Sequence, residues 1–97
     1  MIIFEVDKQE QEITKNIIQS LGKENTIIVE KNSLSGIEVI QIILDHIDEI
    51  GVILSVIKQY AEFGKVSVKI QDIEVTGYNE KKITRLLEKA KKIKEDE

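Results

Sequence analysis

The sequence SGIEVIQIILDHIDEIGVILSVIKQYAEF, residues 35–63, is the longest apolar-rich segment of the chain, and the rest of the fold must pack around it. Apolar residues in its first half recur at the spacing of one helical face, namely Ile37, Ile40, Leu44 and Ile47. Ser35 and Glu38 have the spacing of a capping box, so we expect a helix to begin there. A strand over residues 37–44 is the competing interpretation, because Ile and Val also favour strands.

A second helix is expected in the remainder of this segment, where Gly51 separates it from the first. Its apolar face consists of Ile50, Ile53, Leu54, Ile57 and Ala61, and Gly64 would end it. The segment is long enough to suggest a membrane span, but charged residues interrupt it, namely Glu38, Asp45, Asp48, Glu49 and Lys58. Each acid at the centre of a bilayer costs about 2.5–3.5 kcal/mol, so we reject a membrane span.

The residues before this segment predict a strand, a helix and a second strand. Residues 2–6, IIFEV, are apolar on both faces, which favours an interior strand. Asp7 and Glu10 have capping-box spacing for a helix with its apolar face over residues 13–21, and Gly22 is suited to end that helix. Residues 26–30, TIIVE, form the second strand, and this succession suggests a right-handed parallel crossover.

The residues after this segment predict a hairpin and a final helix. Residues 66–70 and 73–75 alternate apolar and polar side chains. A turn at Gln71 and Asp72 would place apolar residues of the two strands opposite each other, Ile70 with Ile73 and Val68 with Val75. Asn79 is the expected N-cap of the last helix. The apolar stripe of that helix is Ile83, Leu86, Leu87, Ala90 and Ile93.

Together these elements predict one α+β domain over residues 1–94, followed by a frayed acidic tail at residues 95–97. The expected element order is β-α-β-α-α-β-β-α, with a four-stranded mixed sheet and the helices packed on one face. A length of 97 residues with 41% hydrophobic and 33% charged residues is sufficient for a single globular core.

The charge of the chain is divided between an acidic body and a basic C-terminal segment. Residues 1–79 contain seven Lys and thirteen acids, whereas residues 81–94 contain six Lys and one Arg against Glu88 alone. An acidic body argues against nucleic acid as the main partner, since duplex affinity comes mostly from phosphate neutralisation. The candidate basic face comprises Lys81, Lys82, Arg85, Lys89 and Lys92.

Few residues are suited to catalysis or to holding a cofactor. The chain has no Cys, which excludes disulfides and thiolate chemistry, and His46 is its one imidazole. His46 with Asp45 or Glu49 gives fewer ligands than a divalent site normally needs. No serine lies in a nucleophile-elbow motif, and the loop KNSLSG, residues 31–36, lacks the spacing of phosphate-binding motifs.

We therefore predict no catalytic residue, no metal and no cofactor, and expect function to depend on contact with a protein partner. The candidate partner contacts are Asp45, His46, Asp48 and Glu49, together with the exposed edge of the predicted hairpin. The N-terminus shows neither the charged region nor the cleavage site of a signal peptide, so we expect a cytoplasmic location.

The order of features in the chain also carries a resemblance. A small-residue entry, Ser35–Gly36, leads into an apolar region interrupted by Gly51, with Tyr60 late in that region. The hairpin runs VSVKI and IEVTG and a last helix follow. In this layout the chain resembles the effector-associated constant component domains of bacterial conflict systems. The resemblance implies a small adaptor that accompanies effectors such as proteases or NTPases and brings no catalytic residues.

These observations predict a non-enzymatic protein-interaction domain, an adaptor or accessory component of a prokaryotic defence or conflict system. One alternative is a stand-alone immunity protein or phage anti-defence inhibitor. A weaker alternative is nucleic-acid binding through the basic C-terminal helix. The identity of the protein partner is left open, as is a homodimer formed by pairing of sheet edges.

Overall fold

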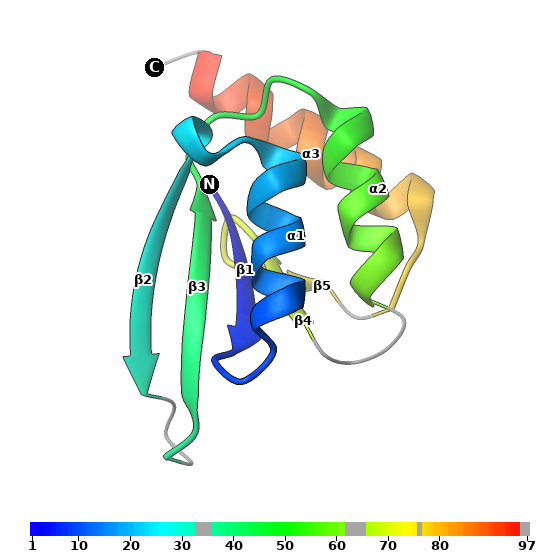
Figure 1. Cartoon of the computed structure of the whole chain (residues 1–97). Helices are drawn as coiled ribbons and strands as arrows, with labels where there is room; N and C mark the ends of the chain where they lie inside the picture. The colour runs from blue at the N-terminus through cyan, green and yellow to red at the C-terminus, as the bar shows by residue number, and fades with distance from the viewer. Residues whose placement is uncertain (33–35, 62–65, 76, 96–97) are drawn as a thin grey trace.

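A single sheet lies at the centre of the fold (Figure 1). In the computed structural model, which describes residues 1–32, 36–61, 66–75 and 77–95, five strands form one antiparallel sheet in the order β2-β3-β1-β4-β5. The strands are β1 (Ile2–Asp7), β2 (Thr26–Asn32), β3 (Glu38–Leu44), β4 (Val66–Ile70) and β5 (Ile73–Val75). The helices are α1 (Gln11–Leu21), α2 (Ile50–Ala61) and α3 (Glu80–Glu95), with a short 3-10 helix, η1 (Lys23–Asn25).

The strands are connected as two interleaved split β-α-β units. β1 and β2 run in the same direction on either side of β3, and α1 connects them. In the same way β3 and β4 lie on either side of β1, and α2 connects them. This is the ferredoxin-like arrangement, to which β5 and α3 are added. The helices lie on one face of the sheet, as expected (Figure 1).

The α+β class is confirmed, but the predicted four-stranded mixed sheet and the predicted element order are wrong. The observed order is β-α-β-β-α-β-β-α, and each pair of neighbouring strands is antiparallel. The predicted crossover does connect two parallel strands, β1 and β2, but these strands are not neighbours in the sheet. β3 separates the two parallel strands instead, so it forms ladders with both of them.

The error lies in residues 38–44, which form β3 and not a helix. Ile42 and Leu44 are buried beneath the helices, whereas Gln41 and Ile43 are half-buried on the opposite face of the sheet. A strand between two neighbours covers apolar side chains on both faces, and β-branched residues pack well on such a surface. Because β3 has apolar residues on both faces, its sequence also fits the spacing of one helical face, although no helix forms there.

Two predicted capping boxes, one with Glu38 and one with Asp7, are wrong. Glu38 begins a strand, and its predicted capping partner Ser35 lies outside the described residues, as does Gly64. Because β3 follows Gly36, the loop 31–36 leads to no helix N-terminus that could hold an anion. Asp7 is wrong as an N-cap: it ends β1, and its Oδ1 accepts a hydrogen bond from the Gln9 amide at 2.9 Å.

Other local predictions are confirmed. β1 is an interior strand, and α1 ends at Leu21, where the Gly22 amide donates to the Ile18 carbonyl at 2.9 Å. In the β4–β5 hairpin Ile70 pairs with Ile73 and Val68 with Val75, as expected. The Oδ1 of Asn79 accepts a hydrogen bond from the Lys82 amide at 3.2 Å, so Asn79 caps α3.

The core lies between the sheet and the three helices. β1 contributes Phe4, the largest fully buried side chain, with Ile2 and Val6 on the same face. Each helix contributes one buried stripe, represented by Ile17 of α1, Ile57 of α2 and Leu87 of α3. Burying these branched side chains, at about 1.5–3 kcal/mol each, supplies the main stabilisation of the fold.

Lys8 links the turn after β1 to the β2–β3 hairpin. Its Nζ lies 3.3 Å from Glu38 Oε2 and 3.5 Å from Glu30 Oε2. The hydrogen bond to Glu38, followed by the charge of Glu30, raises the pKa of Lys8 above its ordinary value of 10.5. The three side chains are well exposed, so this cluster contributes little to stability at ordinary salt concentration.

Candidate functional site

The predicted acidic contacts lie on the connection from β3 to α2, at the end of the sheet where α1 also ends. Asp45, His46, Asp48 and Glu49 are all exposed on this connection, which is not helical. Ile47, between them, is 5% exposed and anchors the connection to the core. The expectation of a helix through these residues is therefore wrong, because the residues around His46 form a loop.

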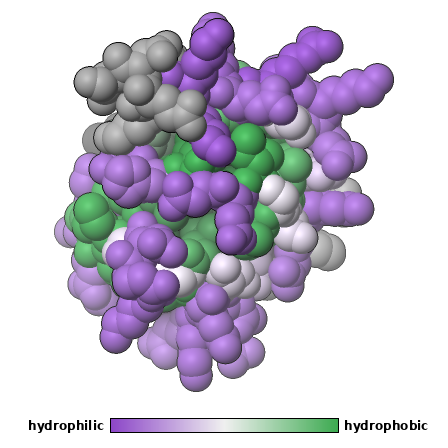
Figure 2. Space-filling model, turned by 90° about the horizontal axis from the view of Figure 1, so that it is seen from above, coloured by the Kyte–Doolittle hydropathy of each residue, from purple (hydrophilic) through white to green (hydrophobic). Residues whose placement is uncertain are grey.

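An open cavity of about 310 Å³ lies beside this loop, between the end of α1, η1 and the start of α2. Apolar side chains, Leu21, Leu44, Val52 and Ile53, form part of its lining. Polar residues, Glu24, His46, Asp48 and Glu49, also contribute to it. Figure 2 looks onto this end of the molecule and shows apolar surface surrounded by hydrophilic side chains.

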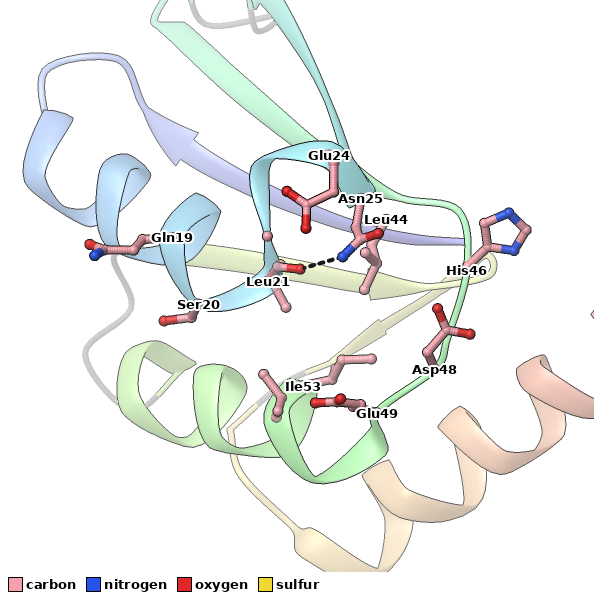
Figure 3. Close-up of a pocket in the computed structure, with 12 residues that line it drawn as sticks. Gln19, Ser20, Leu21, Glu24, Asn25, Leu44, His46, Asp48, Glu49 and Ile53 are labelled. Carbon is pink, nitrogen blue, oxygen red and sulfur yellow. Dashed lines mark hydrogen bonds between the residues drawn. The ribbon is translucent and has the colours of Figure 1, made fainter.

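Three carboxylates contribute to this site, and we refer to Glu24, Asp48 and Glu49 as the acidic corner. Figure 3 shows Glu24 coming from η1 and Glu49 from the start of α2, on opposite sides of the cavity, while the His46 ring is directed away from it. The Glu49 carbonyl accepts the Ile53 amide at 3.2 Å, so Glu49 stands at the N-terminus of α2. A negative charge there is stabilised by the helix dipole, typically by about 0.3–1 kcal/mol.

The turn after α1 determines where Glu24 lies. Gly22 has φ +92°, a backbone conformation that favours glycine. A Cβ at this position would lie 2.7 Å from Asn25 Nδ2 and 3.1 Å from Glu24 Oε1. The Asn25 side chain in turn donates to the Leu21 carbonyl at 3.1 Å and so satisfies the end of α1 (Figure 3).

The structure therefore brings together residues that are distant in sequence. His46, Asp48 and Glu49 were predicted contacts and they line the cavity, whereas Asp45 is exposed on the same loop. Glu24 was not predicted. Gly22 was read correctly as a helix end, but no local pattern indicates that the following turn lies against the loop after β3.

The chemistry available at this site is that of cation recognition. Among the residues that the structure describes, no group of three or more His, Cys, Asp or Glu residues is arranged to hold a metal ion. The exposed carboxylates of the acidic corner can accept hydrogen bonds from a ligand, and the apolar lining offers contact to a hydrocarbon chain. A larger hollow of about 580 Å³, lined in part by Lys8 and Glu38, lies at the turn after β1.

The predicted basic face lies on α3. Its members, Lys81, Lys82, Arg85, Lys89 and Lys92, are all exposed. At about 100° per residue they fall within an arc of roughly 100° on the helix. The buried stripe of the same helix, Ile83, Leu87 and Ala90, lies on the opposite side. The five side chains thus form one basic surface along the solvent side of α3.

Comparisons of the chain with protein-family models, with curated proteins and with solved structures returned no match. The resemblance to effector-associated constant component domains therefore stays a prediction. Every helix in the described part of the chain is too short or too polar to cross a membrane.

Proposed function

We propose that this chain is a small, non-enzymatic protein-interaction domain that binds a basic segment of a protein partner at the acidic corner. The observation that carries the proposal is the cavity itself, where an apolar lining and three carboxylates occur together. Lys and Arg side chains have the complementary form, since an apolar stem ends in a charged head.

The combination matters because charge alone would give little affinity. An exposed ion pair contributes only about 0–1 kcal/mol, and the carboxylates of the acidic corner are exposed. Contact of an Arg stem with Leu21, Val52 and Ile53 adds apolar burial, and the guanidinium then reaches carboxylates on two sides. Arg anchors in such partly enclosed sites are common among residues that dominate binding energy.

The biological role that we favour is an adaptor or accessory component of a prokaryotic defence or conflict system. The layout of the chain supports this role, because such domains accompany separate effectors and act by contact. The alternative within the same class is a stand-alone immunity or phage anti-defence inhibitor. A neighbouring effector gene would favour the adaptor, whereas a toxin or prophage gene would favour the inhibitor.

The proposal is tested by capture of partners from cells of the source organism, using the immobilised full chain and matched variants. The test variant is Asp48→Lys/Glu49→Lys, and the control is Glu12→Lys/Glu74→Lys, whose two sites are exposed and outside the cavity lining. Each double reversal adds four charges and takes the formal net charge from −4 to 0. Far-UV circular dichroism first establishes that both variants are folded.

We expect proteins retained by the unmodified chain to be lost with the test variant and kept with the control, and to elute as salt is raised. Retention of the same proteins by both variants would show that the acidic corner is not the contact surface. A variant with Asp48→Asn/Glu49→Gln removes charge without reversing it and separates lost attraction from new repulsion.

Nucleic-acid binding is the second candidate function, and the basic surface of α3 is the observation that favours it. Neutralising phosphates releases counterions, so affinity for a duplex should fall steeply with salt. Under this alternative Lys81→Glu/Arg85→Glu would weaken binding and reduce the salt slope. Retention on nucleic acid without salt dependence would eliminate it.

A further inference from the structure

β2 is an outer strand of the sheet and is apolar where outer strands are usually protected. It has seven residues, whereas β5 at the other edge has three. Ile27 is 57% exposed on one face of β2, and Ile28 is 46% exposed on the other. Figure 1 shows no described element beyond β2. Natural proteins normally shorten, charge or cover such an edge, because it can pair with another strand.

One hydrogen bond on the side of β3 that faces β1 shows which backbone groups of β2 point outward. The Lys8 amide donates to the Glu38 carbonyl at 3.0 Å, so the polar groups of Glu38 face β1. Along an antiparallel strand these groups alternate between the two neighbours. The residues of β3 that face β2 are therefore Val39, Gln41 and Ile43.

Those three residues pair with Lys31, Val29 and Ile27 of β2, respectively. The alternate residues of β2, Ile28 and Glu30, thus direct their amide and carbonyl groups away from the sheet, as Thr26 directs its carbonyl. The Thr26 amide already donates to the Lys23 carbonyl at the end of η1. A further antiparallel strand would find the amide and carbonyl groups of Ile28 and Glu30, and the carbonyl of Thr26, in the correct hydrogen-bonding phase at this edge.

We propose that β2 pairs antiparallel with β2 of a second copy of this chain, about a two-fold axis at Ile28. Each sheet continues into the other, and Ile28 lies opposite Ile28 of the second copy. Ile27 then lies opposite Val29, and Thr26 opposite Glu30. Apolar side chains meet on both faces of the joined sheet, and no like charges are opposed within this register.

Other registers of the two β2 strands bring less complementary side chains together. We therefore infer pairing with a second copy of the chain about an axis at Ile28. An axis at Val29 would place Ile27 opposite Lys31 and Ile28 opposite Glu30. An axis at Glu30 would oppose that carboxylate with its own copy. A slip of one residue between the strands would bring side chains of opposite faces together, which a continuous sheet does not allow.

The pairing should be weak, and this determines the concentrations at which it is tested. Residues 26–30 span only about 17 Å of strand. The surface buried by this contact falls below the roughly 1,200–2,000 Å² of a standard stable interface. We therefore expect half-association at tens to hundreds of micromolar, a range accessible to sedimentation and to NMR.

Disulfide trapping tests the register, because the chain contains no Cys of its own. In a hydrogen-bonded antiparallel pair the Cα atoms are about 5.5 Å apart, within the range that a disulfide spans. We expect Ile28→Cys to give a covalent dimer with oxidised glutathione. Val29→Cys, which does not oppose itself in this register, should cross-link at least ten-fold more slowly. Equal rates, or faster trapping through Val29→Cys, would overturn the register.

Association itself is tested by sedimentation equilibrium up to 1 mM. The unmodified chain should rise from 11.1 kDa towards twice that mass. Ile28→Lys should remain at the mass of one chain, while Ile73→Lys should associate normally. Ile73 is a matched control, because it is 48% exposed and lies on the opposite edge strand. A single-chain mass at 1 mM, or equal loss in both variants, would refute the proposal.

Amide exchange of the unmodified chain provides a measurement without substitutions. Exchange of the Ile28 amide should slow at least several-fold between 20 µM and 1 mM, whereas Ile27 and Val29 should not change. The outward-facing Ile28 amide becomes protected only in the pair, and the other two already bond to β3. Concentration-independent exchange at Ile28 would exclude pairing through this edge.

Discussion

Replacing Ile42 or Ile43 by Ala distinguishes the strand β3 from the helix that the same residues also suggest. In the strand Ile42 is 0% exposed beneath the helices, and Ile43 is half-buried on the other face. In the helix Ile43 would lie beside the apolar stripe and Ile42 on the opposite, polar side. The two assignments therefore predict opposite orders of destabilisation.

The magnitude follows from the burial. Ile→Ala removes three carbon atoms, worth about 0.8 kcal/mol each when buried, or about 2.4 kcal/mol at Ile42. The cavity left in the core adds to this, so we expect a loss of about 3–4 kcal/mol in the free energy of unfolding. Ile43 leaves a space open to solvent, and its loss should be roughly 1 kcal/mol.

Urea unfolding followed by far-UV circular dichroism measures both values. The same substitution changes intrinsic strand and helix propensity equally at the two sites, so their difference reports burial. Should Ile42→Ala be too unstable to measure, Ile42→Val and Ile43→Val keep the comparison, with an expected cost of about 0.5–1.5 kcal/mol at Ile42. A larger loss at Ile43 than at Ile42 would refute the strand assignment.

Three further predictions concern single positions. Gly22→Ala should lower the free energy of unfolding by about 1–3 kcal/mol, because Gly22 has a positive φ and an added Cβ would lie close to Asn25. Gly51→Ala should be neutral or stabilising, because Gly51 lies in a helix with open space around it. Equal effects of the two substitutions would contradict this reasoning. Gln71→Gly should raise stability by up to about 1 kcal/mol, because Gln71 holds φ 56° in the hairpin turn; a loss in urea unfolding would contradict it. Lys8→Met should lower the melting temperature slightly at neutral pH and low salt, because the ion pairs of Lys8 are exposed. The difference should vanish as the pH rises past the raised pKa of Lys8, because a group with a raised folded-state pKa stabilises the fold only while it is protonated; a difference that persists at high pH would count against the ion-pair geometry.

The elements that the sequence predicts well are those held by local interactions. In the hairpin at Gln71 and Asp72, β4 alternates buried and exposed side chains, and the apolar residues of β5 pair with the buried ones, so alternation alone predicts its register. Asn79 and Gly22 act at helix ends through contacts within a few residues. In each case neighbouring side chains contain the information, and no distant segment is needed.

Residues 38–44 show what local patterns could not predict. β3 lies between β1 and β2, and both ladders join segments distant in sequence. Its apolar residues on two faces are compatible with a broad helical stripe, and only the pairing partners decide between them. The preceding strand and helix were correctly recognised, but the insertion of β3 between the parallel strands has no local signal.

The site was predicted in part for the same reason. The sequence indicated Asp48 and Glu49 as exposed acids beside an apolar segment, and both line the cavity. Glu24 reaches the same cavity from η1, through a turn whose geometry depends on Gly22 and Asn25. Short-range patterns predict that turn but not what it lies against.

The most direct test of cation recognition at the acidic corner is an NMR titration of the full chain with N-acetyl-arginine amide, compared with the neutral citrulline analogue. We predict saturable amide shifts that cluster at Leu21, Glu24, Asp48 and Glu49, that are absent with citrulline and that are lost in Asp48→Asn/Glu49→Gln. Shifts spread evenly over the chain, or the same shifts with citrulline, would contradict the account.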